Sequence, residues 1–420
     1  MDKLTGFTGY KTASNLDLYI CKNPKFKTNL IELYLVHPLS REDASKTALL
    51  PYVLYRGSKK YPTSRDIERR LEELYGADLN VSVIKRGELQ LIKFSLELVN
   101  EGFLPEKEPL LEEGLKLLYE LVLNPLFEDK YVEQESEFLK KEIKSLVNDK
   151  YTYAIERCYQ EMCKEEPFGI YKLGTLSGLE EITSEGLYQH YQKLIAQNQI
   201  YLLVVGAVDE KSLQERINEI FTFEHQQPGN FNQTRVRTGV DKVKEVVESL
   251  NVQQGKLSLG FRTGITRNSS QYYALMFYNG LLGAFPHSKL FQNVREKASL
   301  AYYANSRLES TKGLMQITSG IESINYDRAK EIILEQVDKL AQGEFNDDEF
   351  DWTRKALINH LKSSADNNRG LTGHYLLGLI NGKPESIREM ITELEKVKRD
   401  EIIEVARRIE LDTIYFLDKK

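Results

Sequence analysis

Apolar and polar positions alternate along the chain in patterns that predict strands and helices. Residues 92–98 give the clearest strand pattern, because apolar side chains occupy every second position and Lys, Ser and Glu lie between them. Residues 64–75 instead repeat their apolar side chains at helical spacing, and Thr63 and Asp66 fit a capping box at the start of that helix. We therefore expect sheets that are covered on one side by helices.

The predicted elements occur in a similar order in the two halves of the chain. The first half gives strands at 16–22 and 28–36, helices at 44–55 and 64–75, a hairpin turning near Lys85–Glu88, helices at 109–123, 128–149, 151–164 and 185–196, the strand Gln199–Val205 and a helix at 210–221. The second half gives strands at 242–250 and 255–262, helices at 270–281 and 288–297, strands at 300–308 and 313–321, helices at 325–341 and 346–366 with further helix to 408, and the strand Thr413–Leu417. The common order indicates an internal duplication of one α+β unit with an antiparallel sheet.

A polar stretch separates the two halves. Residues 225–240, HQQPGNFNQTRVRTGV, contain Gly and Pro and few core-forming side chains, which is typical of a linker. We predict a first domain at 1–224 and a homologous second domain at 241–420. The length of 420 residues fits this division, since domains average roughly 150 residues.

Composition and charge narrow the classes of partner. The net charge is −6 and no basic block occurs, so nucleic acid is not an expected partner. We expect no signal peptide and no membrane insertion, because the N-terminus has no apolar core and the longest apolar run, near Ile200–Val208, is too short to span a bilayer. The three cysteines, Cys21, Cys158 and Cys163, are a small and odd number, which favours reduced thiols in a cytoplasmic protein.

The stretch ASKTALLPYVLYRGSKKYP, residues 44–62, is a short apolar helical segment followed by a polar tail. It resembles the zinc-binding helix of the pitrilysin/insulinase family, in which His-x-x-Glu-His precedes a tail of the Lys/Arg-Gly-Thr/Ser-Lys-x-Tyr/Phe type. Aligned on Gly57, Ala48, Pro51 and Tyr52 stand where that family has His, Glu and His. The two histidines of the motif hold zinc and the glutamate serves as general base.

Alanine and proline can neither bind zinc nor act as a general base, so the resemblance implies no catalytic residue and no zinc site at these positions. The alternative is an ordinary buried helix, since short apolar helices are common. Under either interpretation, Pro51 is expected to shorten or interrupt the helix, because proline removes a backbone donor and clashes one turn back.

Three further segments resemble the same family, in the family's order. They are LNPLF (123–127) followed by ESEFLKKEI (135–143), then ITSEGLYQHYQKLIAQNQIYLLVVGAVD (182–209), and LLGAFPHSKLFQNVREKASLAYYANS (281–306). In the first of these, Glu135 and Glu142 resemble the paired glutamates of the family's third-ligand helix, with Glu142 at the ligand position. Glu142 alone cannot form a catalytic zinc site, which needs about three protein ligands. The alternative for Glu142 is a solvated helix glutamate among lysines.

In the last segment, Arg295 and Tyr302 stand where active members of the family place an Arg–Tyr pair that binds the substrate backbone. Arginine offers several donors to a carbonyl and tyrosine offers one hydroxyl. The alternative is that Arg295 pairs with Glu296 and that Tyr302 belongs to the core.

No metal site is assigned from the histidines, because none lie at i, i+4 spacing and none have a cysteine or a second histidine nearby in sequence. His190 is expected on a helix surface. The six histidines are His37, His190, His225, His287, His360 and His374.

The family resemblance implies an architecture of two homologous α+β domains, which is half of a four-domain clamshell around a peptide chamber. It further implies a non-catalytic subunit of a heterodimeric zinc metallopeptidase, in which a homologous partner chain holds the zinc and this chain holds no cofactor. Arg295 and Tyr302 would then contact a peptide substrate held at the partner's zinc. Two alternatives remain: a purely structural relative, and a peptidase that is active alone through other ligands.

Overall fold

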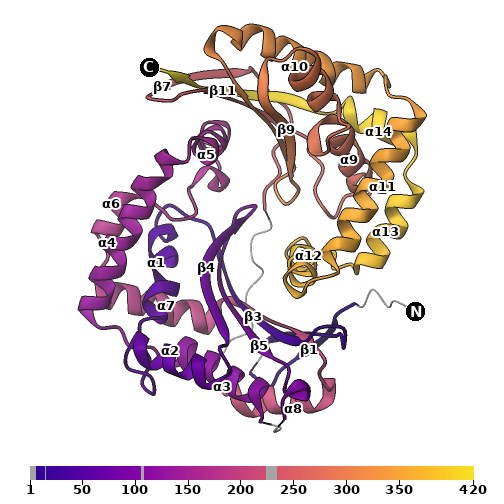
Figure 1. Cartoon of the computed structure of the whole chain (residues 1–420). Coiled ribbons are helices and arrows are strands. Elements are labelled where there is room, and N and C mark those ends of the chain that lie inside the picture. The colour runs from indigo at the N-terminus through magenta and orange to yellow at the C-terminus, as the bar shows by residue number, and fades with distance from the viewer. Residues whose placement is uncertain (1–5, 15, 106–107, 224–233) are drawn as a thin grey trace. The chain divides into compact units, whose positions relative to one another are not determined.

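The computed structural model describes residues 6–14, 16–105, 108–223 and 234–420, in which each half of the chain builds one β-sheet (Figure 1). The strands of the first sheet are β1 (Thr8–Lys11), β2 (Asp17–Lys22), β3 (Thr28–Pro38), β4 (Asp78–Arg86), β5 (Leu89–Val99) and β6 (Gln199–Gly206). Those of the second sheet are β7 (Lys244–Leu250), β8 (Gly255–Arg262), β9 (Ala301–Glu309), β10 (Leu314–Ile321) and β11 (Glu410–Lys419).

The two sheets share one strand order. The first has the order β1-β2-β6-β3-β5-β4, and the second has the order β7-β11-β8-β10-β9, which is the same pattern without the extra edge strand. In each sheet one pair is parallel, β2 with β6 and β7 with β11, and the other neighbours are antiparallel. The predicted α+β class with antiparallel-rich sheets is confirmed.

Helices form most of the connections between these strands. In the first half they are α1 (Ala44–Leu54), α2 (Ser64–Glu73), α3 (Leu110–Leu123), α4 (Asp129–Ser145), α5 (Lys150–Met162), α6 (Leu176–Glu180), α7 (Ser184–Gln197) and α8 (Glu210–Ile220). In the second half they are α9 (Tyr272–Asn279), α10 (Tyr326–Ala341), α11 (Asp347–Ser364), α12 (Asn368–Ile380), α13 (Ile387–Lys396) and α14 (Arg399–Ala406). Shorter turns are η1 (Glu101–Phe103), η2 (Leu146–Asn148), η3 (Pro167–Gly169), η6 (Ser323–Asn325) and the π-helical η4 (Gly280–Ala284) and η5 (Phe291–Lys297).

The core of the first unit lies between its sheet and the helices α1, α3 and α7. β3 directs Ile31, Leu33 and Leu35 to this side, and all three are buried. Within α1 only Lys46 and Tyr52 are partly exposed. A helix buried on nearly all sides has no polar stripe, which explains why the sequence of α1 is apolar almost throughout.

The chain forms two compact units that are not its two continuous halves. One unit consists of Met1–Lys144, Ile170–Gln233 and Ala365–Leu376, and the other consists of Ser145–Gly169, Thr234–Ser364 and Leu377–Lys420. Each half therefore contributes one helical segment to the other unit: α5 joins the second unit, and most of α12 joins the first. These two helices correspond in the duplication, because each directly follows a long helix, α4 or α11.

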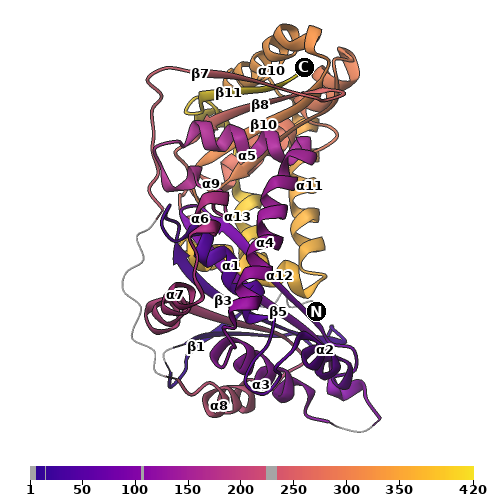
Figure 2. The same ribbon diagram turned by 90° about the vertical axis from the view of Figure 1, so that its left-hand side faces the viewer.

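In the second unit, α5 packs along the sheet of that unit (Figure 2). Cys158 of α5 belongs to an apolar cluster with Tyr415 and Leu417 of β11. Gln316 of β10 donates a hydrogen bond to the backbone carbonyl of Ile155 at 3.2 Å. Both apolar and polar contacts therefore hold α5 on the sheet.

A buried ion cluster secures the segment that follows α5. Glu166 accepts from Arg262 of β8 at 2.7 Å and pairs with Lys312 at 2.7 Å. Arg262 also donates to Asp412 at 2.6 Å. Arg262 and Lys312 are almost completely buried, so their charges depend on these carboxylates.

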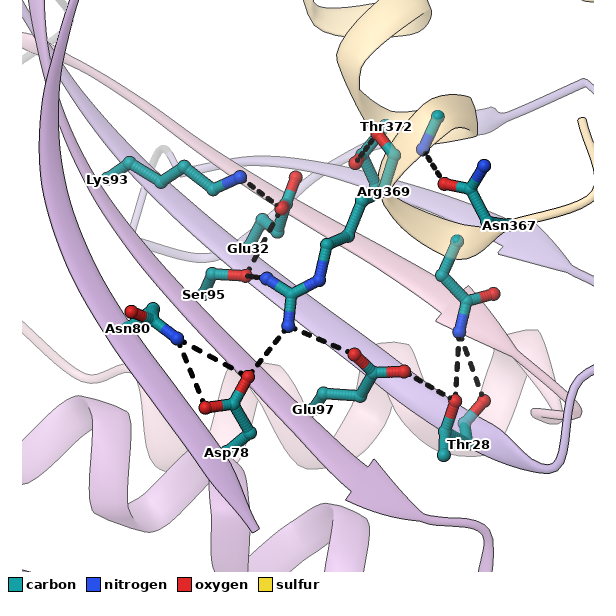
Figure 3. Close-up of polar contacts among 12 residues, drawn as sticks. Thr28, Glu32, Asp78, Asn80, Lys93, Ser95, Glu97, Asn367, Arg369 and Thr372 are labelled. Atoms are coloured by element: carbon teal, nitrogen blue, oxygen red, sulfur yellow. Dashed lines mark hydrogen bonds and ion pairs between the residues drawn. The ribbon is translucent and has the colours of Figure 1, made fainter. Parts of the chain in front are cut away.

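In the first unit, the beginning of α12 contacts the polar side of the sheet (Figure 3). Arg369 donates to Ser95 at 3.0 Å, to Asp78 at 2.9 Å and to Glu97 at 3.0 Å. Asn368 donates to the hydroxyl of Thr28 at 3.1 Å. These contacts explain why the strand pattern of 92–98 places Ser and Glu on the side away from the apolar core.

The two units differ from the predicted continuous domains 1–224 and 241–420 in the segments 145–169 and 365–376. Amphipathic periodicity cannot report this exchange, because it fixes which face of a helix is buried but not which sheet buries it. Of the predicted linker at 225–240, residues 225–233 lie outside the described residues. Among the helices that the structure describes, none combines the length and apolar character needed to cross a bilayer.

Candidate functional site

The helix α1 carries the positions that align with the zinc-binding motif. Ala48 and Pro51 are buried in the core, whereas Tyr52 is partly exposed. The helix is continuous from Ala44 to Leu54 with Pro51 inside it, so the expected interruption at Pro51 is wrong. Proline still removes one backbone donor, but the surrounding core keeps the chain helical until the end of that turn.

The polar tail that follows α1 docks on the second segment of family resemblance, residues 123–127. The backbone N–H of Lys59 donates to the carbonyl of Asn124 at 2.9 Å, and that of Leu126 donates to the carbonyl of Gly57 at 3.0 Å. A Cβ at Gly57 would lie 2.5 Å from the carbonyl oxygen of Pro62, so this turn requires glycine. The segments 44–62 and 123–127, which are far apart in the sequence and each resemble the family, are thus packed together.

The structure also brings α1 and the glutamates of α4 together. The ring of Tyr52 lies 6.2 Å from that of Phe138, between centroids. Burial raises the pKa of the Tyr52 hydroxyl to about 12, and the charges of Glu142 and Glu135 add to this effect. Glu135 is buried and forms an ion pair with Arg56 of the polar tail. The contacts of α1 and its polar tail with α4 are therefore an aromatic pair, Tyr52 with Phe138, and an ion pair, Arg56 with Glu135.

Arg295 and Tyr302 lie on either side of the turn between η5 and β9 in the second unit. The Arg295 guanidinium lies 4.6 Å from the centroid of the Phe291 ring, and its Nε lies 3.5 Å from a carboxylate oxygen of Glu296. Within the turn Ser299 has a φ of 52°, a conformation that few residues other than glycine adopt. The contact of Arg295 with Glu296 matches the alternative interpretation of that arginine.

Tyr302 does not belong to the core, because 79% of its surface is exposed. It is the extra residue of a β-bulge: Gly320 pairs with Tyr303, and the next residue, Ile321, pairs with Ala301. A bulge turns a side chain out of the regular alternation of a strand and is frequent beside functional sites. β9 is also an edge strand of its sheet, so one side of its backbone has no neighbouring strand within the described sheet.

One cluster was missed by the sequence analysis altogether. His37 at the end of β3, Asp43 at the start of α1 and His190 of α7 place one ligand atom each within 4.8 Å of one another. His37 Nε2 lies 3.3 Å from one oxygen of Asp43, and His190 Nδ1 lies 3.6 Å from the other. Each ring has a further partner: Asn198 lies 2.7 Å from His37 Nδ1, and the Thr47 hydroxyl lies 2.9 Å from His190 Nε2.

His190 is buried, so the prediction that it lies on a helix surface is wrong. Burial, followed by the neighbouring His37, lowers the pKa of His190 to about 4. The hydrogen bond with His37 is the main cause that lowers the pKa of Asp43 to about 2. The cluster is therefore a carboxylate between two imidazoles. The imidazole of His190 is neutral at neutral pH. No sequence signal marks the cluster, because the two histidines are far apart in the chain.

Comparison with known proteins shows the family of this chain. The chain is 40% identical over 408 residues to the "Probable inactive metalloprotease YmfF" of Bacillus subtilis strain 168, a match that covers 96% of this chain and 95% of that protein. The description of the family that matches residues 181–357 is "Peptidase M16 inactive domain". The chain belongs to the M16 peptidase family. The resemblance to zinc metallopeptidases found in the four sequence segments is thereby confirmed.

Other matches cover much or all of the chain. A "Conserved protein from Enterococcus faecalis V583" of known crystal structure is 30% identical, covers 99% of both chains and superimposes with a TM-score of 0.89. An "Uncharacterized zinc protease" of Rickettsia felis is 23% identical over 311 residues, which is 71% of this chain and 72% of that protein. The M16 inactive-domain match spans both Arg295 and Tyr302.

Proposed function

We propose that this M16 chain is the non-catalytic subunit of a cytoplasmic, heterodimeric zinc metallopeptidase and that it contributes Arg295 and Tyr302 to peptide binding. A homologous chain with an intact His-x-x-Glu-His motif is the expected partner and supplies the zinc. Within this chain, Ala48, Pro51 and Tyr52 provide neither two imidazole ligands nor a carboxylate base. Glu135, the other retained glutamate, is already paired with Arg56.

The exposure of Tyr302 on a bulged edge strand is the main support for a role in peptide binding. A tyrosine with 79% of its surface exposed adds little to folding, and its hydroxyl is free to meet a ligand. Arg295, whose side chain is 43% exposed, lies across the adjoining turn. The unpaired side of β9 offers backbone donors and acceptors that suit an extended peptide.

A structural subunit without any role in proteolysis is the second candidate. The contact between Arg295 and Glu296 favours it, because that contact needs no substrate. The exposed Tyr302 favours the peptide-binding role. A peptidase that acts alone through other ligands is the third candidate and is tested by the isolated chain.

The test begins with the purified chain in the absence and presence of zinc. We expect no cleavage of a mixed fluorogenic peptide library by the isolated chain, and cleavage after addition of an M16 chain from the same genome that carries His-x-x-Glu-His. Cleavage by the isolated chain that is lost in a Glu142→Gln variant would overturn the proposal. Cleavage by the zinc-bearing chain that is equally fast without this chain would leave the structural role.

A further inference from the structure

Two buried imidazoles and one carboxylate converge beside the first turn of α1. The side chains of His37 and His190 are 11% and 6% exposed, and that of Asp43 is 23% exposed. The two rings are perpendicular, with centroids 5.1 Å apart, and each faces a different oxygen of Asp43. This donor set, two nitrogens and one carboxylate oxygen, is one that zinc and neighbouring divalent transition metals bind well.

We propose that His37, Asp43 and His190 bind one divalent transition-metal ion of the zinc type. Ligands that each lie about 2.1 Å from a tetrahedral zinc are about 3.4 Å apart. His37 Nε2 and His190 Nδ1 lie 3.3 Å and 3.6 Å from Asp43, but from its two different oxygens, so the carboxylate must turn to present one oxygen to the ion. Binding then requires the two rings to close toward each other, since the three ligand atoms lie within 4.8 Å.

The group behind His190 fits the same role, and the group behind His37 must rotate to do so. Coordination through His190 Nδ1 leaves its Nε2–H to donate to the Thr47 hydroxyl, which lies 2.9 Å away. Coordination through His37 Nε2 places the ring proton on Nδ1, which faces the Asn198 amide at 2.7 Å. The amide must then rotate to present its oxygen as acceptor, and it gives up the hydrogen bond that its nitrogen donates to the Val36 carbonyl at 2.9 Å. Such outer contacts fix the orientation of metal-bound imidazoles.

One positive charge competes with the metal. Lys46 lies 3.7 Å from an oxygen of Asp43, but its side chain is partly exposed and can turn to solvent.

An alternative role for the cluster is a nucleophilic triad, because Thr47, His190 and Asp43 follow one another as a hydroxyl, an imidazole and a carboxylate do in such a triad. Thr47 is completely buried in α1, so no substrate carbonyl can reach its hydroxyl.

The metal would be structural and distinct from the family's catalytic zinc. The three ligands come from the end of β3, the residue before α1 and the middle of α7, so one ion joins three elements of the first unit. The motif positions Ala48, Pro51 and Tyr52 are not among them. Metal binding at this cluster therefore requires neither a partner chain nor the proposed function.

The direct test is titration of the full-length, metal-free chain with Co²⁺ and with Zn²⁺. We expect one equivalent of Co²⁺ to give the visible absorption of a low-coordinate nitrogen and oxygen site, and Zn²⁺ to displace it and to raise the melting temperature. Cu²⁺ in place of Co²⁺ should give an electron paramagnetic resonance spectrum with splitting from two nitrogens. The Cu²⁺ measurement uses the unaltered chain, so it does not depend on variants folding.

Three variants locate the site. Asp43→Asn and His190→Gln should each weaken metal binding by at least about tenfold, since even residues behind metal ligands have effects of that size. His287→Gln is the matched control, because His287 also faces a threonine hydroxyl at 2.9 Å, that of Thr353, and belongs to the second unit. It should bind metal as the unaltered chain does.

Two results would overturn the proposal. The first is the absence of stoichiometric Co²⁺ or Zn²⁺ binding, or a Cu²⁺ spectrum without nitrogen splitting, in the unaltered chain. The second is folded Asp43→Asn and His190→Gln variants that bind metal unchanged. Loss of binding in Glu142→Gln alone would assign the metal to the family position instead.

Discussion

Single residues decide whether the family's catalytic chemistry exists in this chain. The family resemblance aligns Ala48 and Tyr52 with histidines of the zinc motif, but Ala48 is completely buried and Tyr52 is partly exposed. A histidine is much larger than an alanine, and a packed core resists added volume. The two positions should therefore tolerate histidine differently.

We predict that Ala48→His lowers the free energy of unfolding by roughly 1–3 kcal/mol, the usual cost of overpacking a core. Tyr52→His keeps one ring at a partly exposed position and should cost less. Urea denaturation of both variants at neutral pH, with a chelator present, measures the difference. An Ala48→His variant as stable as the unaltered chain would show that space for a ligand remains at position 48.

At this scale the sequence shows the type of each residue, whereas most of its contacts cannot be predicted from the sequence. Ala48 and Pro51 lack ligand atoms whatever the fold, so their inability to bind zinc follows from residue type alone. The exposure of Tyr302 depends on a bulge, and a bulge is a matter of strand register that alternation does not reveal. The cluster of His37, Asp43 and His190 depends on contacts between distant parts of the chain, which no local pattern reports.

At the scale of elements, the exchanged segments depend on a few buried charges. Burial alone would raise the pKa of Glu166, but hydrogen bonds from Lys312 and Arg262 outweigh burial and lower it. A carboxyl whose pKa is lowered by folding stabilises the fold above its ordinary pKa of about 4.3. That stabilisation is lost as the pH falls from this value through the lowered pKa.

We predict that Glu166→Gln lowers the free energy of unfolding at neutral pH by roughly 3–5 kcal/mol, because two buried cations lose their shared carboxylate. As the pH falls through the range in which glutamate protonates, the stability of the variant should also decrease less steeply than that of the unaltered chain. Denaturant titrations between neutral and acidic pH measure both effects. Glu165→Gln, at the exposed neighbouring position, is the control and should change little; equal stability of both variants would contradict the role of the ion cluster.

A second prediction concerns the contacts that hold α12 on the sheet of the first unit. Arg369→Ala removes hydrogen bonds to Ser95, Asp78 and Glu97 and should lower stability by about 1–2 kcal/mol, an effect reduced by the partial exposure of the arginine. Backbone amides of residues 368–376 should exchange hydrogen faster, while those of α7 should not. The exposed Arg388→Ala, on α13, serves as control. Unchanged exchange in α12 would mean that contacts other than those of Arg369 hold it on the sheet.

Most strands and helices could be predicted from periodicity, because their apolar faces follow the periods of two and 3.6 residues. The exchange of α5 and α12 could not. Both helices bury one face, and either sheet offers a suitable surface. Long-range contacts, such as those of Ile155 with Gln316 and of Arg369 with Glu97, determine which sheet each helix joins.

At the scale of the whole molecule, this M16 chain has two sheets of one strand order, and its helix α1 contains neither histidine nor glutamate. The proposed function assigns the zinc to a second chain and peptide contacts to Arg295 and Tyr302. Those two side chains are exposed in this chain, so replacing them should alter catalysis in the complex and leave its assembly intact.

The central measurement compares peptide cleavage and complex yield for Arg295→Ala and Tyr302→Phe, each mixed with the zinc-bearing chain. Removing the arginine takes away a charged donor from a polarised carbonyl, and such a loss costs on the order of 10²–10³-fold in turnover. Removing the tyrosine hydroxyl costs roughly 0.5–1.5 kcal/mol, a neutral hydrogen bond. Arg328→Ala, an exposed arginine on α10, is the control. We predict slower cleavage by both variants at normal complex yield, with the larger loss for Arg295→Ala. Cleavage at the unaltered rate by both variants would contradict a role of these side chains in peptide binding.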